Sequence, residues 1–195
     1  MPRRTGTERL EARRARLERH AAETDPAVVM TAAARFLEMR SRSVDEVRRH
    51  LLGAAFPEPL VERTLERLLE LGILDDRAFA TAWVESRDRA RPRGETALRR
   101  ELAFKRIDRE TVAAVLEARS EAAADAGARG SGVGADQIAA ERLIARSRSA
   151  LLRVADPRAR RGRAYAMLAR HGFDPEVCRV VSAGLAGFDE AVDDE

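Results

Sequence analysis

The chain has 195 residues, of which 45% are hydrophobic but only 4% aromatic, so its cores must be small and built from Leu, Ala and Val. Its formal net charge of +3 includes five acidic residues in the last seven positions, without which residues 1–188 carry about +8. That excess favours an anionic partner such as nucleic acid or a nucleoprotein surface. Cys178 is the single cysteine, and no stretch resembles a signal segment or membrane span, which predicts a cytoplasmic protein without a membrane partner.

Residues 1–25 form a polar, Arg-rich extension in which acidic residues such as Glu8, Glu11 and Glu18 are interspersed. Transit peptides are poor in acidic residues, so a targeting role is not indicated. We expect a disordered or transiently helical segment that is either a solvated tail or an arm that helps to bind a polyanion.

Residues 26–72 are predicted to form three helices. Pro26 suits a first helical turn, Ser43 and Glu46 form a capping box before the second helix, and Gly72 ends the third. Apolar residues recur at helical spacing in all three segments: Val29, Ala33, Phe36, Leu37, Val47, Leu51, Leu52, Leu60, Val61, Leu65, Leu68 and Leu69.

Residues 73–124 repeat this organisation. Asp75 and Asp76 could be a carboxylate pair for acid–base or metal chemistry, but at a helix start capping is the favoured interpretation. The break at 91–94 separates the first helix from a second over 95–105, and a third follows over 109–124. Phe79 and Trp83 are expected in the core rather than in a base-stacking platform, together with Ala80, Val84, Leu98, Leu102, Ala103, Val112, Val115 and Leu116.

A Gly-rich linker over 125–135 precedes a third three-helix segment over 136–187, which breaks at Asp156–Pro157, and an acidic tail occupies 188–195. The same pattern, a Leu and then Phe or Ile at a turn, recurs at 51–56, 102–107 and 168–173, each time before a helix-start signal. We therefore predict an all-α protein of three tandem three-helix repeats that form an elongated, curved array.

Several residues resemble a known family: Phe36-Leu37-x-x-Arg40-x-x-Ser43, then Leu71-Gly72-Ile73-Leu74-Asp75-Asp76-x-x-Phe79-Ala80, then Arg87, then Gly94-x-x-x-Leu98-x-x-Glu101-Leu102. This run resembles the RecX family of bacterial recombination regulators over residues 28–120, and repeat logic extends the resemblance to 136–186. It implies curved three-helix modules that bind the RecA recombinase, usually as a filament on DNA, and inhibit its ATPase, strand-exchange and co-protease activities.

The chain departs from that family at two turns. Members often carry Gly before the positions of Phe56 and Ile107, where this chain has Ala55 and Arg106. If these turns need a positive φ angle, the two side chains impose a conformational cost. The long linker and the acidic tail are further departures, and they leave the placement of the third repeat open.

Basic residues gather around the inter-helix turns. We expect them to align as one basic strip that contacts the partner or nucleic acid, and the candidates are Arg40, Arg42, Arg48, Arg87, Arg91, Arg93, Arg99, Arg100, Lys105, Arg160, Arg161 and Arg163. The alternative for each arginine is an ordinary solvated surface in an Arg-rich composition.

No catalytic or metal site is predicted. His20, His50 and His171 are far apart and have no ligand spacing, Cys178 occupies a column held by Val in the other repeats, and no phosphate loop occurs. The sequence thus predicts a non-enzymatic, monomeric regulator without cofactor or metal. The alternative is a sequence-independent DNA-binding helical module that contacts single-stranded or double-stranded DNA directly.

Overall fold

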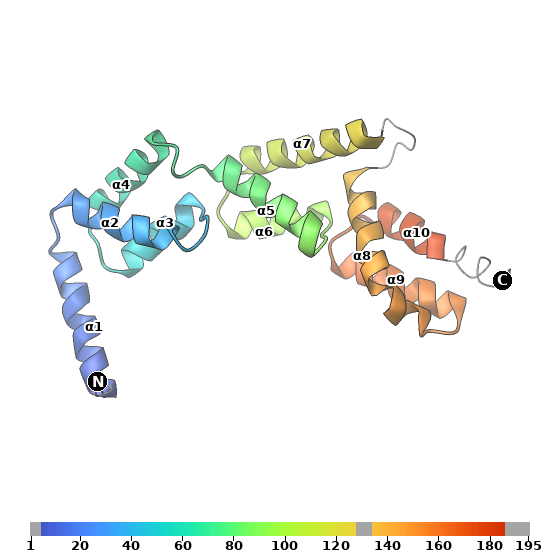
Figure 1. Ribbon diagram of the computed structural model, residues 1–195, viewed down its shortest axis with the longest axis horizontal. Helices are drawn as coiled ribbons and strands as arrows, with labels where there is room; N and C mark the ends of the chain where they lie inside the picture. The colour runs from blue at the N-terminus through green and yellow to red at the C-terminus, as the bar shows by residue number, and fades with distance from the viewer. Residues whose placement is uncertain (1–4, 128–133, 186–195) are drawn as a thin grey trace. The chain divides into compact units, whose positions relative to one another are not determined.

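The computed structural model describes residues 5–127 and 134–185, and within these ranges the chain is entirely helical (Figure 1). The all-α class and the tandem three-helix repeats are confirmed. The ten helices of the described ranges are α1 (Gly6–Ala21), α2 (Pro26–Leu37), α3 (Val44–Gly53), α4 (Glu58–Glu70), α5 (Asp76–Ala90), α6 (Glu95–Phe104), α7 (Arg109–Gly127), α8 (Ala135–Leu152), α9 (Pro157–Arg170) and α10 (Pro175–Ala183).

The chain divides into two compact units, Met1–Phe79 and Ala80–Glu195. The first holds α1, repeat 1 (α2–α4) and the first turn of α5, and the second holds the rest of repeat 2 (α5–α7) with repeat 3 (α8–α10). The division falls inside α5 because the start of that helix packs with repeat 1. Leu74 joins the repeat 1 core, and an Asp76 carboxylate oxygen accepts a hydrogen bond from the Val44 N–H at 2.9 Å.

The N-terminal extension, expected to be disordered or transiently helical, contains a helix of 16 residues. Thr5 and Glu8 form a capping box at its start, which supplies partners for free N–H groups. At its end, the His20 ring stacks on Phe56 with centroids 4.2 Å apart, and its Nδ1 lies 2.8 Å from the Ala54 carbonyl oxygen. These tertiary contacts hold the end of α1 against repeat 1.

Repeat 1 closes around an apolar core. Val29, Val47, Leu51, Leu65 and their neighbours are buried between α2, α3 and α4. The predicted capping box is present, because the Ser43 side chain accepts from the Glu46 N–H and Glu46 accepts from the Ser43 N–H.

Repeats 2 and 3 show where the expected helix ends need correction. The last helix of repeat 2 runs to Gly127 rather than 124, and α8 begins at Ala135, so both ends of the predicted linker are helical. The middle of that linker, 128–133, and the tail 188–195 lie outside the described residues. Asp75 caps α5 as predicted, since its carboxylate accepts from the Ala78 N–H at 2.9 Å.

Four turns after helices require a left-handed backbone. The φ angle is +65° at Gly72 and +80° at Gly172, but it is also +67° at Ala55 and +60° at Arg106. Side chains make this conformation costly by about 1–2 kcal/mol. The two departures from the family pattern are therefore strained turns, with the same backbone geometry that glycine provides elsewhere in the chain.

Within the second unit, the backbones of repeats 2 and 3 meet closely. The Gly94 N–H donates to the His171 carbonyl oxygen at 3.1 Å, and a Cβ atom at Gly94 would lie 2.2 Å from the Gly172 oxygen. Asp136 of repeat 3 accepts from the Glu95 N–H at 2.9 Å, at the start of α6. Gly94 is thus required by the close approach of two backbones, because its φ angle of −73° is open to any residue.

Candidate partner-binding surface

The three candidate residues of repeat 1 all make intramolecular contacts. Arg40 pairs with Glu46 at 3.1 Å, and the Arg42 guanidinium lies 4.1 Å from the centre of the Phe36 ring. Arg48 donates two hydrogen bonds to Glu62, at 2.7 and 2.8 Å, the geometry in which Arg recognises a carboxylate. This pairing raises the pKa of Arg48 and lowers that of Glu62. A partner would have to compete with these contacts.

Three candidates of repeat 2 surround one half-buried Trp. The Trp83 Nε1–H and the Arg87 Nε–H both donate to Glu101, at 2.8 and 2.6 Å, and Arg93 Nε lies 3.6 Å from the other oxygen of that carboxylate. Arg87 and Lys105 also lie over the Trp83 ring. Trp83, expected in the core, is therefore the centre of a cationic cluster that fixes α5 to α6.

The remaining candidates of repeat 2 are more accessible. Arg99 is exposed and pairs with Glu95 one turn earlier, whereas the Arg91 and Arg100 side chains have no ion pair or hydrogen bond among the described residues. Such exposed cations are available to carboxylates or phosphates at little cost in desolvation.

Sequence reasoning missed Phe104, the last residue of α6, which is 77% exposed. It lies one turn after Arg100, so the two side chains share a face of the helix. The signal was in the repeat: Phe104 occupies the position of Gly53 in repeat 1 and Arg170 in repeat 3. Two repeats fold without an aromatic residue there, so the fold does not require it.

In repeat 3 the candidates differ from one another. Arg160 is only 6% exposed and donates to the carbonyl oxygens of Val154 and Ala155, so it stabilises the turn between α8 and α9. Arg161 and Arg163 are exposed and make no ion pair in the described part of the chain. Other exposed arginines of this repeat whose side chains have neither an ion pair nor a hydrogen bond there are Arg142, Arg153, Arg158 and Arg170, whereas Arg146 donates to the carbonyl oxygens of Arg89 and Ala90.

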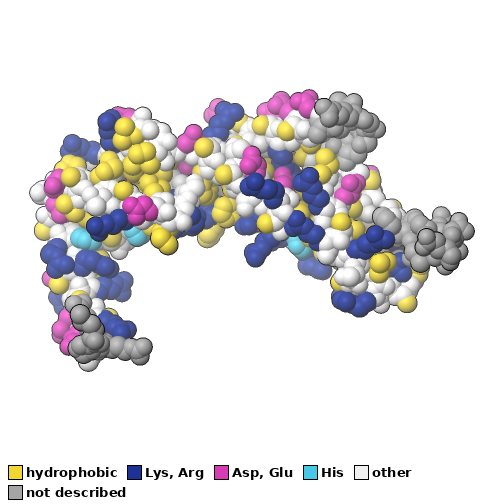
Figure 2. Space-filling view, viewed as in Figure 1, with side chains coloured by type: hydrophobic (Ala, Val, Ile, Leu, Met, Phe, Trp, Pro, Cys, Tyr) yellow, Lys and Arg dark blue, Asp and Glu magenta, His cyan; other side chains and the backbone are white. Residues whose placement is uncertain are grey.

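Charge is distributed unequally among the helices of each repeat. The third helices of repeats 1 and 2, α4 and α7, each contain four acidic and two basic residues, and the third helix of repeat 3, α10, contains one of each. In contrast, α9, a second helix, contains five arginines and no acidic residue. In the second unit, acidic side chains gather along α7 and basic ones over α8 and α9 (Figure 2). In three-helix DNA-binding domains such as the homeodomain the third helix enters the major groove, and here the net negative charge of α4 and α7 would repel phosphates.

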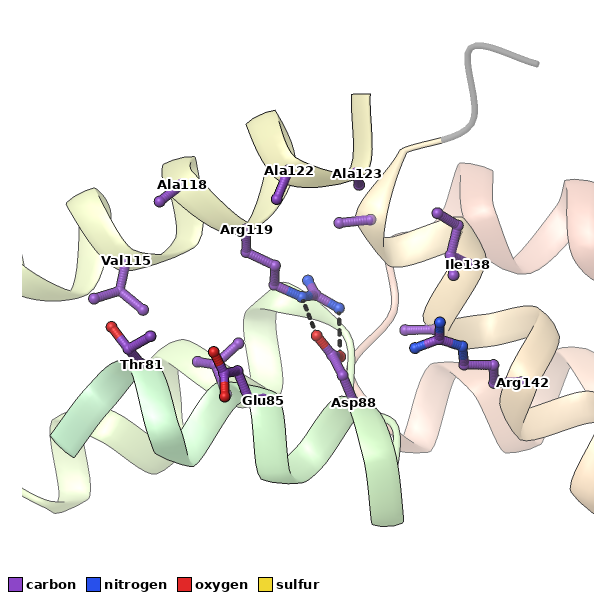
Figure 3. A pocket seen from close by; sticks show the side chains of 13 residues that line it. Thr81, Glu85, Asp88, Val115, Ala118, Arg119, Ala122, Ala123, Ile138 and Arg142 are labelled. Carbon is purple, nitrogen blue, oxygen red and sulfur yellow. Dashed lines mark hydrogen bonds and ion pairs between the residues drawn. The ribbon is translucent and has the colours of Figure 1, made fainter. Parts of the chain in front are cut away.

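A shallow groove of about 380 Å³ lies between α5, α7 and α8. Figure 3 shows Arg119 reaching from α7 to Asp88 of α5, below the small side chains of Ala118, Ala122 and Ala123. Arg119 also binds Asp136 at 2.7 Å, and its side chain is only 9% exposed. Arg119, Asp88 and Asp136 bind one another, which indicates a structural joint between repeats.

Comparison with known proteins identifies the family. Residues 30–68 match the family described as RecX, first three-helix domain, and residues 75–116 match RecX, second three-helix domain. Regulatory protein RecX of Mycobacterium ulcerans (strain Agy99) is 38% identical over 154 residues, which cover 78% of this chain and 82% of that protein. This chain belongs to the RecX family.

Further relatives agree with that assignment. Regulatory protein RecX of Mycobacterium tuberculosis (strain ATCC 25177 / H37Ra) is 35% identical over 157 residues, covering 78% of this chain and 83% of that protein. A crystal structure of RecX from Lactobacillus salivarius has the same fold, with a TM-score of 0.67 at 16% identity, over 83% of this chain and 96% of that one. A second RecX crystal structure has a TM-score of 0.64 at 18% identity, over 81% and 71% of the two chains.

Three further observations concern metal ligands, membrane helices and the single cysteine. In the described ranges no three His, Cys, Asp or Glu residues are grouped to hold a metal, and no helix there has the length and apolar character to cross a membrane. Cys178 is fully buried, and burial raises the pKa of its thiol, with a smaller contribution from Asp174. A protonated core thiol is a poor nucleophile, as its repeat position predicted.

Proposed function

We propose that this RecX protein is a non-enzymatic regulator of homologous recombination and the SOS response that binds the RecA recombinase, usually as a filament on DNA. By bridging RecA subunits it inhibits their ATPase, strand-exchange and co-protease activities. Family membership supports the choice of partner. We further propose that it acts in the cytoplasm as a monomer, without metal or cofactor.

The observation that carries the choice of surface is the α6 face of repeat 2. It combines Arg100, which has no ion pair or hydrogen bond from its side chain within the described ranges, with the exposed ring of Phe104 and the exposed ion pair of Arg99 with Glu95. Exposed aromatic and Arg side chains are typical of residues that dominate protein interfaces. The competing contacts of Arg40, Arg48, Arg87 and Arg93, and the burial of Arg160, make those five weaker candidates.

The alternative is a sequence-independent DNA-binding helical module. The arginines of α9 are compatible with it, but the acidic helices α4 and α7 disfavour insertion of either one into the major groove. Direct contact with DNA would then use α9 and the exposed arginines beside it, through phosphates rather than bases.

The test is DNA-dependent ATP hydrolysis by RecA, measured against increasing amounts of wild-type protein and of the double variant Arg99→Glu/Arg100→Glu. Loss of surface cations should leave folding intact, within about 0.5 kcal/mol, because neither side chain is buried. We expect the variant to inhibit poorly and to show a reduced salt dependence. The matched control is Arg63→Glu/Arg67→Glu on α4, which changes the same charge outside the proposed surface and should inhibit as wild type does.

Equal inhibition by wild type and by the Arg99→Glu/Arg100→Glu variant would remove the α6 face from the interface. Wild-type protein that fails to inhibit, yet binds bare single-stranded DNA equally with and without RecA, would support the DNA-binding alternative instead.

A further inference from the structure

Helix α2 has a second, partly exposed face beside the one that is buried in the core of repeat 1, and Ala32 and Phe36 of this face pack only partly against the core. Val29 and Ala33 of α2 are buried in the core, whereas Val28 and Met39 remain exposed, Met39 to 80%. This second face carries a stripe of Val28, Thr31, Ala32, Arg35 and Phe36, at positions i, i+3, i+4, i+7 and i+8, and Met39 extends it in the turn that follows the helix. The helical part, from Val28 to Phe36, is about 12 Å long, or roughly two turns of helix.

This stripe forms one wall of an open groove with a volume of about 610 Å³. Arg16 and His20 of α1 and His50 of α3 complete the lining, with Phe56 below. Histidine and arginine side chains gather where α1 meets α2 and α3 (Figure 2). The groove lining contains no carboxylate, although acidic residues make up about half of the charged residues in the chain.

The rings in the groove already have partners. Phe36 stacks on His50 with centroids 3.8 Å apart, and Arg42 covers Phe36 at 4.1 Å, while Phe56 stacks on His20. Burial and the nearby Arg42 lower the pKa of His50, which keeps that ring neutral near pH 7. The unoccupied surface is therefore aliphatic along the floor and cationic at Arg16 and Arg35.

We propose that this groove between α1 and α2 binds an amphipathic helix with an acidic face, contributed by a protein partner. Apolar residues of that helix at i, i+3, i+4 and i+7 pack against Val28, Ala32 and Met39, the spacing by which helices dock in grooves. Acidic residues on its flanks meet Arg16 and Arg35. Methionine suits this role because its flexible side chain adapts to the bound apolar surface.

Two other occupants fit the groove less well. A second copy of the same stripe would bring Arg35 toward another Arg35 with no carboxylate to separate them, so self-pairing is unfavourable. Single-stranded nucleic acid binds by stacking bases on free aromatic faces, and the two rings here are covered by His20, His50 and Arg42. This inference does not depend on RecA as the partner.

The experiment uses the full chain labelled with ¹³C-methyl methionine. The probe is a synthetic peptide of roughly 18 residues, long enough to span the groove. In this peptide Leu recurs at helical spacing, i, i+3, i+4 and i+7, and every other residue is Glu. The expected result is a shift of the Met39 methyl signal on addition of the peptide, while Met167 in repeat 3 stays unchanged. A scrambled peptide of equal composition should shift neither signal.

Binding is then quantified by fluorescence anisotropy. Met39→Glu and Arg35→Glu should each weaken the peptide by at least about tenfold, and far-ultraviolet circular dichroism should remain that of the wild type because both side chains are exposed. Arg67→Glu, on α4 outside the groove, is the charge-matched control and should bind as wild type does.

Four results would overturn the proposal. The first three are absence of peptide binding, equal binding of the scrambled peptide, and wild-type affinity in Met39→Glu. The fourth is a Met39 shift caused by oligo(dT) and not by the acidic peptide, which would assign the groove to nucleic acid.

Discussion

Repeat 1 and the pair formed by repeats 2 and 3 use the same three-helix architecture, and repeat 3 has an apolar core as repeat 1 does, but the pair has polar contacts between its modules in addition. Repeat 1 closes an apolar core of its own, and its bidentate pair of Arg48 and Glu62 lies at the surface. Repeats 2 and 3 are joined by polar groups, with Arg119 held between two carboxylates and two glycine backbones in contact. Apolar burial supplies most of the stability of a module, whereas a satisfied polar network specifies how two modules are oriented.

The largest effect is expected from Gly94→Ala. The new Cβ would lie 2.2 Å from the carbonyl oxygen of Gly172, and a backbone atom cannot move aside as a side chain can. We expect the second unit to lose about 3 kcal/mol of unfolding free energy, measured by urea denaturation, because the two backbones must separate. Gly53→Ala is the control: its Cβ would meet nothing within 4 Å, so stability should be unchanged or slightly higher.

The second effect is expected from Arg119→Met, which leaves Asp88 and Asp136 close together without their shared cation. The loss should be about 2–3 kcal/mol, below the value for a fully buried pair because both carboxylates keep about a fifth of their surface exposed. Arg99→Met, which breaks an exposed pair on α6, should cost about 0.5 kcal/mol or less. Equal losses in thermal denaturation of the two variants would show that the Arg119 network does not orient the repeats.

A smaller, opposite effect is expected at the strained turns. Ala55→Gly and Arg106→Gly should each raise the unfolding free energy by about 0.5–1 kcal/mol, since glycine removes the cost of a positive φ but adds entropy to the unfolded chain. The reverse change, Gly72→Ala, should lower stability. The two variants test one turn in each unit. If Ala55→Gly raises the unfolding free energy and Arg106→Gly does not, contacts of the Arg106 side chain compensate for its strained backbone.

The smallest effect is expected from Glu62→Gln in repeat 1. Arg48 lowers the pKa of Glu62 below its ordinary value of 4.5, so the folded state binds this proton less tightly than the unfolded state does. The stabilisation is present above the ordinary pKa and is lost as pH falls through the lower, folded value. Since the pair is exposed, the wild type should lose only about 0.5 kcal/mol relative to Glu62→Gln between neutral and acidic pH. If the difference in unfolding free energy between wild type and Glu62→Gln does not change with pH, the pair of Arg48 and Glu62 is not the cause of that difference.

The sequence predicted those features that depend on neighbours in the chain. The capping box of Ser43 and Glu46, the cap at Asp75 and the end of α4 at Gly72 follow from local hydrogen bonding and backbone freedom. The core columns also follow, because helical periodicity and three aligned repeats identify the same inward positions.

Features that depend on tertiary contacts could not be read from the chain. Arg160 belongs to a dense basic run, yet it is buried. Its guanidinium donates hydrogen bonds to two carbonyl oxygens of a turn, which provide the partners that a buried charge needs. Arg87 and Arg93 occur in an apparently exposed basic segment but converge on Glu101, which is several residues away in sequence. Formal charge therefore overstated how many arginines of the candidate surface are available to a partner.

Helix α6 has no side-chain cap from its own repeat, because residue 94 is glycine. Instead, the carboxylate of Asp136 in repeat 3 accepts a hydrogen bond from the Glu95 N–H at the start of the helix. That same carboxylate neutralises Arg119 of repeat 2. If repeat 2 were transferred to another protein without repeat 3, the Glu95 N–H at the start of α6 would lose its acceptor, Asp136. Arg119 would lose one of its two carboxylate partners. Repeats 2 and 3 together, and not repeat 2 alone, therefore form the smallest segment that keeps both of these contacts.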